Sequence, residues 1–237
     1  MRSLTLSAVF LAAVALPSLT VTARPDDKPA AAEPRFDAVV REDLFAGFKG
    51  DAEALARGAK SCDDALAKNP KNAEALVWRG AAKVFRAGQL FGAGKAATAM
   101  PLWTAGLKDM DDAVALEPNN VGVRIPRAAV LLPSARNAPP AMGKPLLKKA
   151  LGDFEAIEAA QTAAGQLDKL GTHPRGELRM GLADTYRLMG DADKSKAQLD
   201  AVLKELPDTK YAKRATEWLA AKPDAKLAHD CIGCHTK

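Results

Sequence analysis

The chain has 237 residues, of which 48% are hydrophobic and only 5% aromatic, and alanine is the most frequent residue type. Because alanine has the highest helix propensity while β-branched and aromatic residues favour strands, this composition argues against an all-β sandwich or barrel and for closely packed helices. The 34 basic and 29 acidic residues give a net charge of +5, with both signs mixed along the chain. The basic stripe with interleaved aromatics that is typical of nucleic-acid binding is absent from the sequence.

The first 23 residues have the layout of a secretory signal peptide. A positive start at Arg2 is followed by the apolar segment 4–16, and the small residues at 21–23 fit a cleavage site. The alternative for residues 1–23 is an uncleaved N-terminal anchor. We predict cleavage, which places the mature protein in the periplasm or another extracytoplasmic space. No later segment reaches the run of about 18 apolar residues that a membrane helix needs.

Residues 24–35 read RPDDKPAAAEPR, which is charged, rich in proline and without hydrophobic periodicity. Such a segment buries too little apolar surface to offset the entropy of ordering it. We therefore predict a flexible leader between the signal peptide and a folded helical domain over residues 36–220.

An internal repeat with an offset of 48 residues occupies the middle of the chain. Residues 58–72 and 106–120 share Gly, Lys, Asp-Asp, two Ala, Pro and a final Asn at the same relative positions. Each block is predicted to be a helix that ends before its proline, since the residue before proline disfavours the helical conformation. A new helix is then expected to start at Asn72 and at Asn120.

A third copy of the pattern, residues 182–191, is predicted to be a helix ended by Gly190, and the next helix covers residues 192–206. Small and apolar residues lie at the signature spacings of the tetratricopeptide repeat, namely Leu182, Ala183, Tyr186, Gly190, Leu199 and Pro207 in this copy and Trp103, Gly106, Ala113 and Pro118 in the second. The chain thus resembles the tetratricopeptide repeat family. The resemblance implies an all-α solenoid of stacked helical hairpins whose concave surface often binds peptides or partner proteins.

Two parts of the repeat region depart from the family pattern. Leu90 to Met100 is predicted to be an insertion, either a longer helix or a loop. A weaker helix pair is predicted over residues 123–132 and 146–161, separated by a loop because prolines are unfavourable inside helices. The prolines of this predicted loop are Pro133, Pro139, Pro140 and Pro145.

Charged residues recur on the predicted helices without forming a catalytic pattern. The Asp-Asp pairs at 63–64 and 111–112 fit a solvated face or a tie to a neighbouring helix better than acid–base catalysis. Cys62 takes the place that Met110 has in the next copy, which predicts a small buried apolar residue. Four arginines either line the concave groove or lie on a solvated helix face, namely Arg124, Arg127, Arg179 and Arg187.

The tail, residues 221–237, carries the one sharp chemical motif of the sequence. Cys231-x-x-Cys234-His235 resembles the haem-attachment motif of c-type cytochromes. The resemblance implies one covalent haem c per chain, with both thiols joined to the vinyl groups of the porphyrin and His235 as the axial ligand of the iron. In that family attachment takes place outside the cytoplasm, which agrees with the signal peptide. We predict a short irregular haem-binding tail.

Other uses of these tail residues compete with haem. A zinc site from His229, Cys231, Cys234 and His235 has suitable ligand types, although four ligands within seven residues leave little chain to form a tetrahedron. A disulfide between the two tail cysteines would close too short a loop to stabilise much. A thioredoxin-type redox pair would need a strand–helix setting, and no strand pattern surrounds the motif.

A sixth ligand of the iron is not assigned by the sequence. Only two residues follow the motif, so the ligand comes from upstream in the chain, from another molecule, or is absent. The upstream candidates are His229, His173, Met180 and Met189. His173 is interpreted as a surface residue at a helix start, and methionines on a helical face are more often core residues than ligands.

Two functions from different classes follow from the sequence. The first is an exported carrier of one c-type haem that acts in electron transfer or haem-linked redox interaction, with another redox protein as partner. The alternative is a non-catalytic interaction scaffold whose tail binds zinc or forms a disulfide. A peroxidase or sensor with five-coordinate haem is a third hypothesis, ranked below electron transfer because the sequence identifies no distal His-Arg pair.

Overall fold

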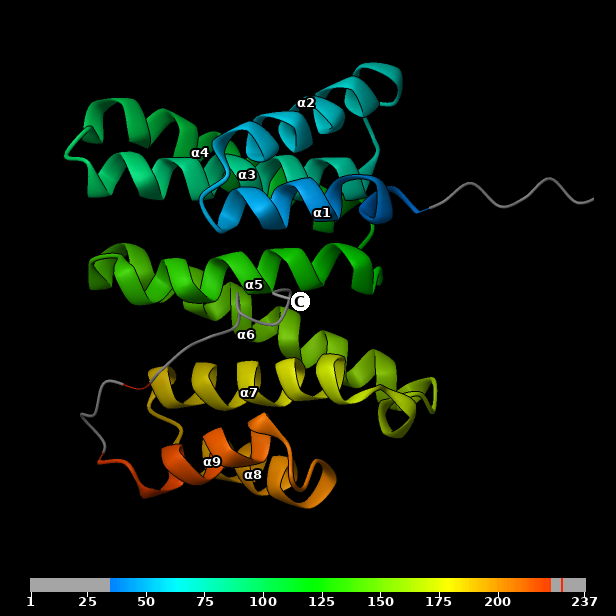
Figure 1. The fold of residues 1–237 in the computed structure, drawn as a ribbon, viewed down its shortest axis with the longest axis vertical. Coiled ribbons are helices and arrows are strands. Elements are labelled where there is room, and N and C mark those ends of the chain that lie inside the picture. Colours follow the sequence, from blue (N-terminus) through cyan, green and yellow to red (C-terminus); the bar gives the residue numbers. More distant parts are fainter. Residues whose placement is uncertain (1–34, 223–226, 228–237) are drawn as a thin grey trace, which may run out of the picture. The chain divides into compact units, whose positions relative to one another are not determined.

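The computed structural model describes residues 35–222 and residue 227, and in this part of the chain every regular element is helical (Figure 1). This confirms the predicted all-α fold class. The α-helices are α1 (Phe36–Phe48), α2 (Ala52–Lys68), α3 (Ala73–Gly92), α4 (Ala96–Leu116), α5 (Val121–Asn137), α6 (Pro140–Ala163), α7 (Thr172–Met189), α8 (Ala192–Glu205) and α9 (Lys210–Ala220). A short 3-10 helix, Leu167–Lys169, lies between α6 and α7.

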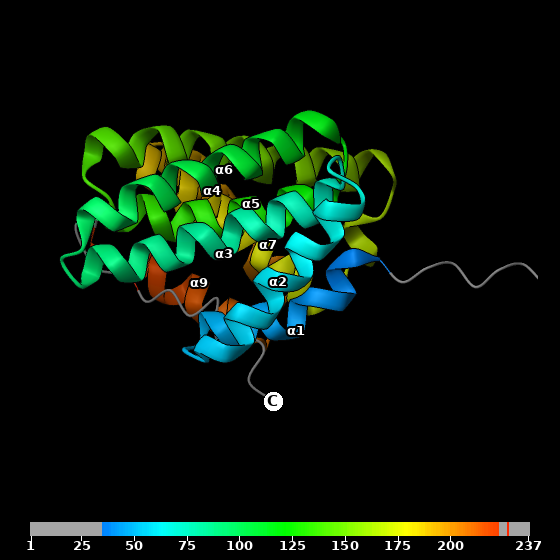
Figure 2. The same ribbon diagram turned by 90° about the horizontal axis from the view of Figure 1, so that it is seen from above.

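The helices pack as successive hairpins, α1 with α2, α3 with α4, α5 with α6, and α7 with α8, while α9 packs on α8. The first helices of neighbouring hairpins also contact one another, α1 with α3, α3 with α5, and α5 with α7 (Figures 1 and 2). Each second helix contacts the first helix of the next hairpin. This stacking of α-hairpins is the predicted tetratricopeptide-like solenoid, in which each hairpin buries its apolar face against its neighbours.

Side-chain caps fix where several of these helices begin. The Asn72 and Asn120 side chains accept hydrogen bonds from the backbone N–H groups of Ala75 and Gly122, which confirms the two predicted helix starts. Gly190 ends α7 with φ of 84°, a left-handed conformation in which glycine has no steric penalty. The repeated local signals of the sequence therefore correspond to real helix boundaries.

The predicted proline loop after residue 132 is wrong. Helix α5 continues through Pro133 to Asn137, and α6 starts at Pro140 with Pro145 inside it. Proline at the first position of a helix loses no hydrogen bond, because that N–H has no partner within the helix. Inside the helices, Pro133 and Pro145 leave the carbonyls four residues earlier without a helical partner. Those residues, Ala129 and Ala141, are exposed, so these turns face solvent, which lowers the cost of a missing helical hydrogen bond.

Of the two alternatives predicted for the insertion at Leu90–Met100, a longer helix or a loop, the structure shows longer helices. Helix α3 has 20 residues and α4 has 21, and only the short turn from Ala93 to Lys95 separates them. The predicted pair over 123–132 and 146–161 is also confirmed, with both helices longer than expected.

The apolar core is divided along the stack. The largest cluster extends from Val40 in α1 to Ala150 in α6, and a second joins α7, α8 and α9 around Met180 and Trp218. A third, smaller cluster joins α6 to α7 around Ile157 and Leu182, and Phe154 packs against both this cluster and the largest one. Leu227 packs against the second cluster. None of the helices in the described ranges is both long and apolar enough to cross a membrane.

Candidate functional site

The predicted haem-binding residues Cys231, Cys234 and His235 lie outside the described residues, as does His229. Within residues 35–222 and 227, no group of three or more His, Cys, Asp or Glu side chains is arranged to hold a metal ion. The described part of the chain therefore bears on the haem hypothesis through the surfaces that it offers to the tail and through the upstream candidates for a sixth ligand.

The upstream candidates for a sixth ligand lie in three different environments on α7. His173 is half-exposed, and its Nδ1 lies 2.9 Å from the hydroxyl of Tyr211, which itself donates to Glu177 at 2.7 Å. Met180 is 3% exposed inside the α7–α9 core, whereas Met189 is 47% exposed on the last turn of the helix. Met180 is thus a core residue, as interpreted from the sequence, and Met189 is not.

Cys62 is fully buried in the core cluster of α1 to α6, as predicted from its repeat position. Burial, with a smaller contribution from the neighbouring Asp63 carboxylate, raises the pKa of its thiol to about 12. A thiol with this pKa is almost entirely protonated at neutral pH, so Cys62 has no nucleophilic character.

Three arginines form a repeated set of ion pairs, which we call the arginine ladder: Arg79 on α3, Arg127 on α5 and Arg179 on α7. Each uses Nε and Nη2 to bind a carboxylate on the second helix of its own hairpin. The partners are Asp109 (2.8 and 2.8 Å), Asp153 (2.6 and 2.8 Å) and Glu205 (3.2 and 2.8 Å).

The remaining nitrogen of each ladder arginine reaches back to the preceding hairpin. Nη1 of Arg79 lies 3.4 Å from Asp63 on α2, and Nη1 of Arg127 lies 3.0 Å from Asp111 on α4. Nη1 of Arg179 binds Glu158 on α6. Each arginine therefore joins the second helices of two successive hairpins, so the ladder is a structural device rather than a ligand site.

The ladder corrects the expectation for the groove arginines. Arg127 and Arg179 are each 8% exposed, so they lie neither on a solvated helix face nor free in a groove. Arg124 also binds the buried Asp153, with Nη1 at 2.6 Å from its carboxylate. These arginines act inside the stack, where opposite charges are desolvated together.

In each repeated Asp-Asp pair, one aspartate ties its helix to a neighbouring helix and the other lies on a solvated face, so both predicted roles occur. Asp63 and Asp111 tie their helices to the ladder arginines of the next hairpin. Asp64 and Asp112 instead make exposed pairs with the lysines one turn earlier, Lys60 and Lys108. Neither pair has the geometry of two carboxylates sharing a reacting group.

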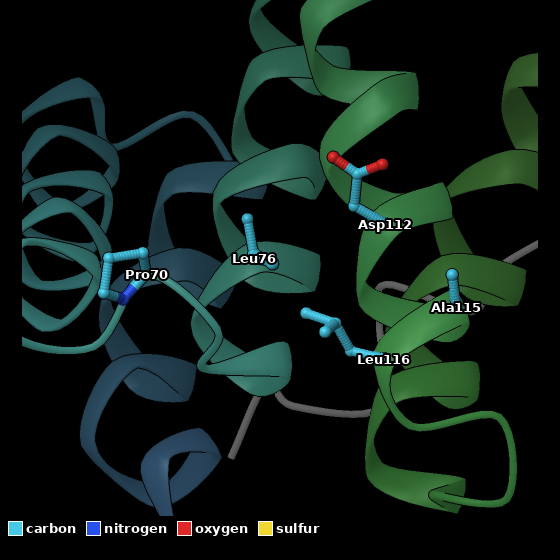
Figure 3. A pocket seen from close by; sticks show the side chains of 5 residues that line it. All are labelled: Pro70, Leu76, Asp112, Ala115 and Leu116. Carbon is cyan, nitrogen blue, oxygen red and sulfur yellow. The ribbon is translucent and has the colours of Figure 1, made fainter.

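One surface pocket lies between the α2–α3 turn and the end of α4 (Figure 3). Its lining is apolar apart from the Asp112 carboxylate, and consists of Pro70, Leu76, Asp112, Ala115 and Leu116. Because Asp112 is already paired with Lys108 and the lining has no nucleophile, the pocket has no catalytic character.

A second charged group, at the carboxyl ends of α5 and α7, was missed by the sequence analysis. Asp184 is 1% exposed and accepts hydrogen bonds from Arg136 Nε at 2.8 Å and Arg187 Nη2 at 3.0 Å. The guanidinium of Arg187 also lies 5.9 Å from the ring centroid of Trp218 on α9. No sequence signal predicts this group, because 48 residues separate Arg136 from Asp184 and only the stacking brings them together.

Comparisons with protein-family models and with curated proteins find no match. Among solved structures, the chain is similar to the crystal structure of a thermophilic TPR protein in Thermus thermophilus, with 21% sequence identity and a TM-score of 0.34. The match covers 77% of this chain and 100% of the other.

Proposed function

We propose that this protein is exported, carries one covalent c-type haem on its C-terminal tail, and acts in electron transfer or haem-linked redox interaction with a partner protein. The observation that carries the proposal is the sequence Cys231-x-x-Cys234-His235. The signal-like residues 1–23 support it independently, because they direct the chain to the compartment where such haem attachment takes place. The helical-repeat scaffold fits a role in binding another protein.

The tail residues have the chemistry that attachment requires. Each thiol of Cys231 and Cys234 adds across one vinyl group, with its sulfur bonding one carbon and its proton passing to the other, so no oxidant and no leaving group are needed. The imidazole of His235 is a strong ligand for iron. When bound, the haem supplies a one-electron couple, and the polypeptide supplies the choice of partner.

Intact-mass spectrometry of protein matured in a host with haem-attachment machinery tests the proposal. We expect the mass of a polypeptide without the signal peptide plus one haem, and a Soret band that stays with the protein during acid–acetone extraction. A mass equal to that of the bare polypeptide overturns the haem proposal.

The second candidate is an interaction scaffold whose tail binds zinc or forms a disulfide, and the ligand types of His229, Cys231, Cys234 and His235 favour it over other tail functions. Metal analysis and a thiol count after unfolding separate the candidates. Haem attachment leaves only Cys62 reactive, both before and after reduction. A tail disulfide leaves one reactive thiol that becomes three on reduction, and zinc with a chelator leaves all three cysteines reactive.

An open iron position would shift the proposed role from electron transfer towards a peroxidase or sensor. Rapid binding of carbon monoxide to the reduced protein identifies such a position. A slow or absent reaction supports electron transfer through a six-coordinate iron.

A further inference from the structure

At the carboxyl ends of α5 and α7, two arginines surround one buried acid. Two guanidinium groups, those of Arg136 and Arg187, bind the single carboxylate of Asp184. The Nε of Arg187 is buried and has no hydrogen-bond partner. A buried donor without an acceptor destabilises the folded state, so an acceptor that reaches this guanidinium is energetically favoured.

The last turns of α7 and α9 also carry exposed apolar side chains. Leu188 follows Arg187 on the last turn of α7, Leu219 follows Trp218 on the last turn of α9, and each leucine is 36% exposed. The contact of Arg187 with Trp218 holds the two helix ends together. We call the surface of Arg136, Arg187, Leu188 and Leu219 the α7–α9 end surface. It combines cationic donors with apolar groups, which suits a ligand that has an apolar face and carboxylates.

The chain itself brings such a ligand close. Helix α9 ends at Ala220, and Leu227 packs against the core cluster that contains Ala183 and Trp218. Cys231 is only four residues beyond Leu227, so even a fully extended chain places it within about 14 Å of that leucine. This tether confines the attachment motif to the neighbourhood of the last hairpin.

We propose that the haem attached to residues 231–235 seats on the α7–α9 end surface. Arg136 and Arg187 pair with the haem propionates, and Leu188 and Leu219 contact the edge of the porphyrin. This inference rests on the proposed function. It adds a docking site on the repeat domain, so that the redox group is presented in a fixed position instead of on a free tail.

Hydrogen–deuterium exchange of the full chain tests the seating. The haem-loaded protein is compared with the haem-free double variant Cys231→Ala/Cys234→Ala. We expect backbone amides in the last turns of α7 and α9 to exchange at least about fivefold more slowly in the loaded protein. Amides around Leu116 at the end of α4 should exchange equally in both proteins.

Surface variants of the loaded protein separate seating from a general effect of haem. Arg187→Gln and Leu188→Glu should each reduce the protection at the helix ends to less than about twofold. Arg187→Gln also removes a partner of the buried Asp184 and so could alter the fold. Leu188→Glu tests the seating without this effect, because Leu188 is exposed. Arg86→Gln, an exposed arginine on α3, is the matched control and should keep full protection.

The outcomes distinguish this inference from the proposed function. A loaded protein without protection at α7 and α9, or with protection that survives both Arg187→Gln and Leu188→Glu, overturns the seating while haem attachment stands. Protection that appears only after an acidic partner protein is added assigns the surface to that partner instead. A chain that never acquires haem overturns the proposed function itself, and intact mass shows this before any exchange is measured.

Discussion

Buried ion pairs determine how single residues of this stack respond to substitution. Asp153 is fully buried, and both Arg124 and Arg127 bind its carboxylate. We expect Asp153→Ala to lower the free energy of unfolding by about 3–5 kcal/mol, because it leaves the buried charge of Arg127 without its main partner. Urea denaturation followed by circular dichroism measures the change.

The matched control for that substitution is an exposed pair in the same fold. Lys60 and Asp64 face solvent on α2 at a spacing of one helical turn. Removing Lys60 should change stability by less than about 0.5 kcal/mol. Equal effects of Asp153→Ala and Lys60→Ala would contradict a special role for the buried network.

Asp109 is expected to make the stack sensitive to acid. Burial alone would raise the pKa of this carboxyl, but hydrogen bonds and charge from Arg79 and Lys83 outweigh burial and lower the pKa below 3.8. A lowered pKa in the folded state stabilises the protein above the unfolded value near 3.8 and loses this contribution as the pH falls further. We expect Asp109→Asn to be less stable than the wild type at pH 7, with the difference shrinking below pH 4.

Unfolding free energies measured from pH 7 to pH 3 test this prediction. Asp64→Asn, which removes an exposed carboxylate, is the control and should change the free energy of unfolding at pH 7 by less than about 0.5 kcal/mol. A constant difference between Asp109→Asn and the wild type across the range would show that the pairing does not depend on ionisation.

At the scale of the helices, close approach of α3 and α4 depends on two glycines. A Cβ added to Gly80 would lie 2.7 Å from the carbonyl oxygen of Gly106 and 2.6 Å from Met110 Cγ. We expect Gly80→Ala to destabilise the protein by about 1–3 kcal/mol, since the packed backbone must move apart. Thermal denaturation of the variant measures this.

Helix α3 offers an internal control for the glycine prediction. A Cβ added to Gly88 meets no atom within 4 Å. Gly88→Ala should therefore stabilise the helix by about 0.5–1 kcal/mol through the higher helix propensity of alanine. If both alanine variants were more stable than the wild type, helix propensity rather than close packing would explain the result.

The sequence predicts helix boundaries well where they depend on the residue at the boundary, and poorly where they depend on residues elsewhere in the fold. Asn72, Asn120 and Gly190 mark helix ends through their own backbone and side-chain preferences, and the structure confirms all three. Pro133 and Pro145 misled the prediction because the cost of an interior proline depends on exposure of a carbonyl four residues away.

The sequence shows that the residues of the arginine ladder recur, but it does not predict which of them pair. Asp63 and Asp111 recur at an offset of 48 residues, and so do Arg79 and Arg127. The sequence gives no reason to pair them, nor to pair Arg127 with Asp153, because both arrangements need the helices to be stacked first. The haem motif remains a prediction from sequence alone.

For the molecule as a whole, the divided core predicts that the stack opens in stages. Leu199 is 4% exposed in the cluster formed by α7, α8 and α9, which is connected to the main cluster of α1 to α6 only through the smaller cluster around Ile157 and Leu182. We expect Leu199→Ala to cost about 2–5 kcal/mol locally and to speed hydrogen exchange in α7–α9, while amides in α3 and α4 keep their protection. Exchange followed by mass spectrometry resolves the two regions.

Lys196, which is exposed on the same helix, provides the control for this prediction. Lys196→Ala should leave exchange in α7–α9 within about twofold of the wild type. Uniform acceleration along the whole chain in Leu199→Ala would instead show that the solenoid unfolds as one cooperative unit.

The arginine ladder also gives the solenoid a preferred direction of bending. Arg79, Arg127 and Arg179 each bind the second helices of two neighbouring hairpins, whereas the first helices are joined by apolar contacts, with one ion pair, Arg136–Asp184, added between α5 and α7. Splaying these second helices apart breaks the pairs with Asp63, Asp111 and Glu158, whose side chains are 62%, 41% and 26% exposed, so each pair resists by no more than about 1 kcal/mol. Bending towards the ladder side keeps these inter-hairpin pairs, whereas bending away from that side breaks them.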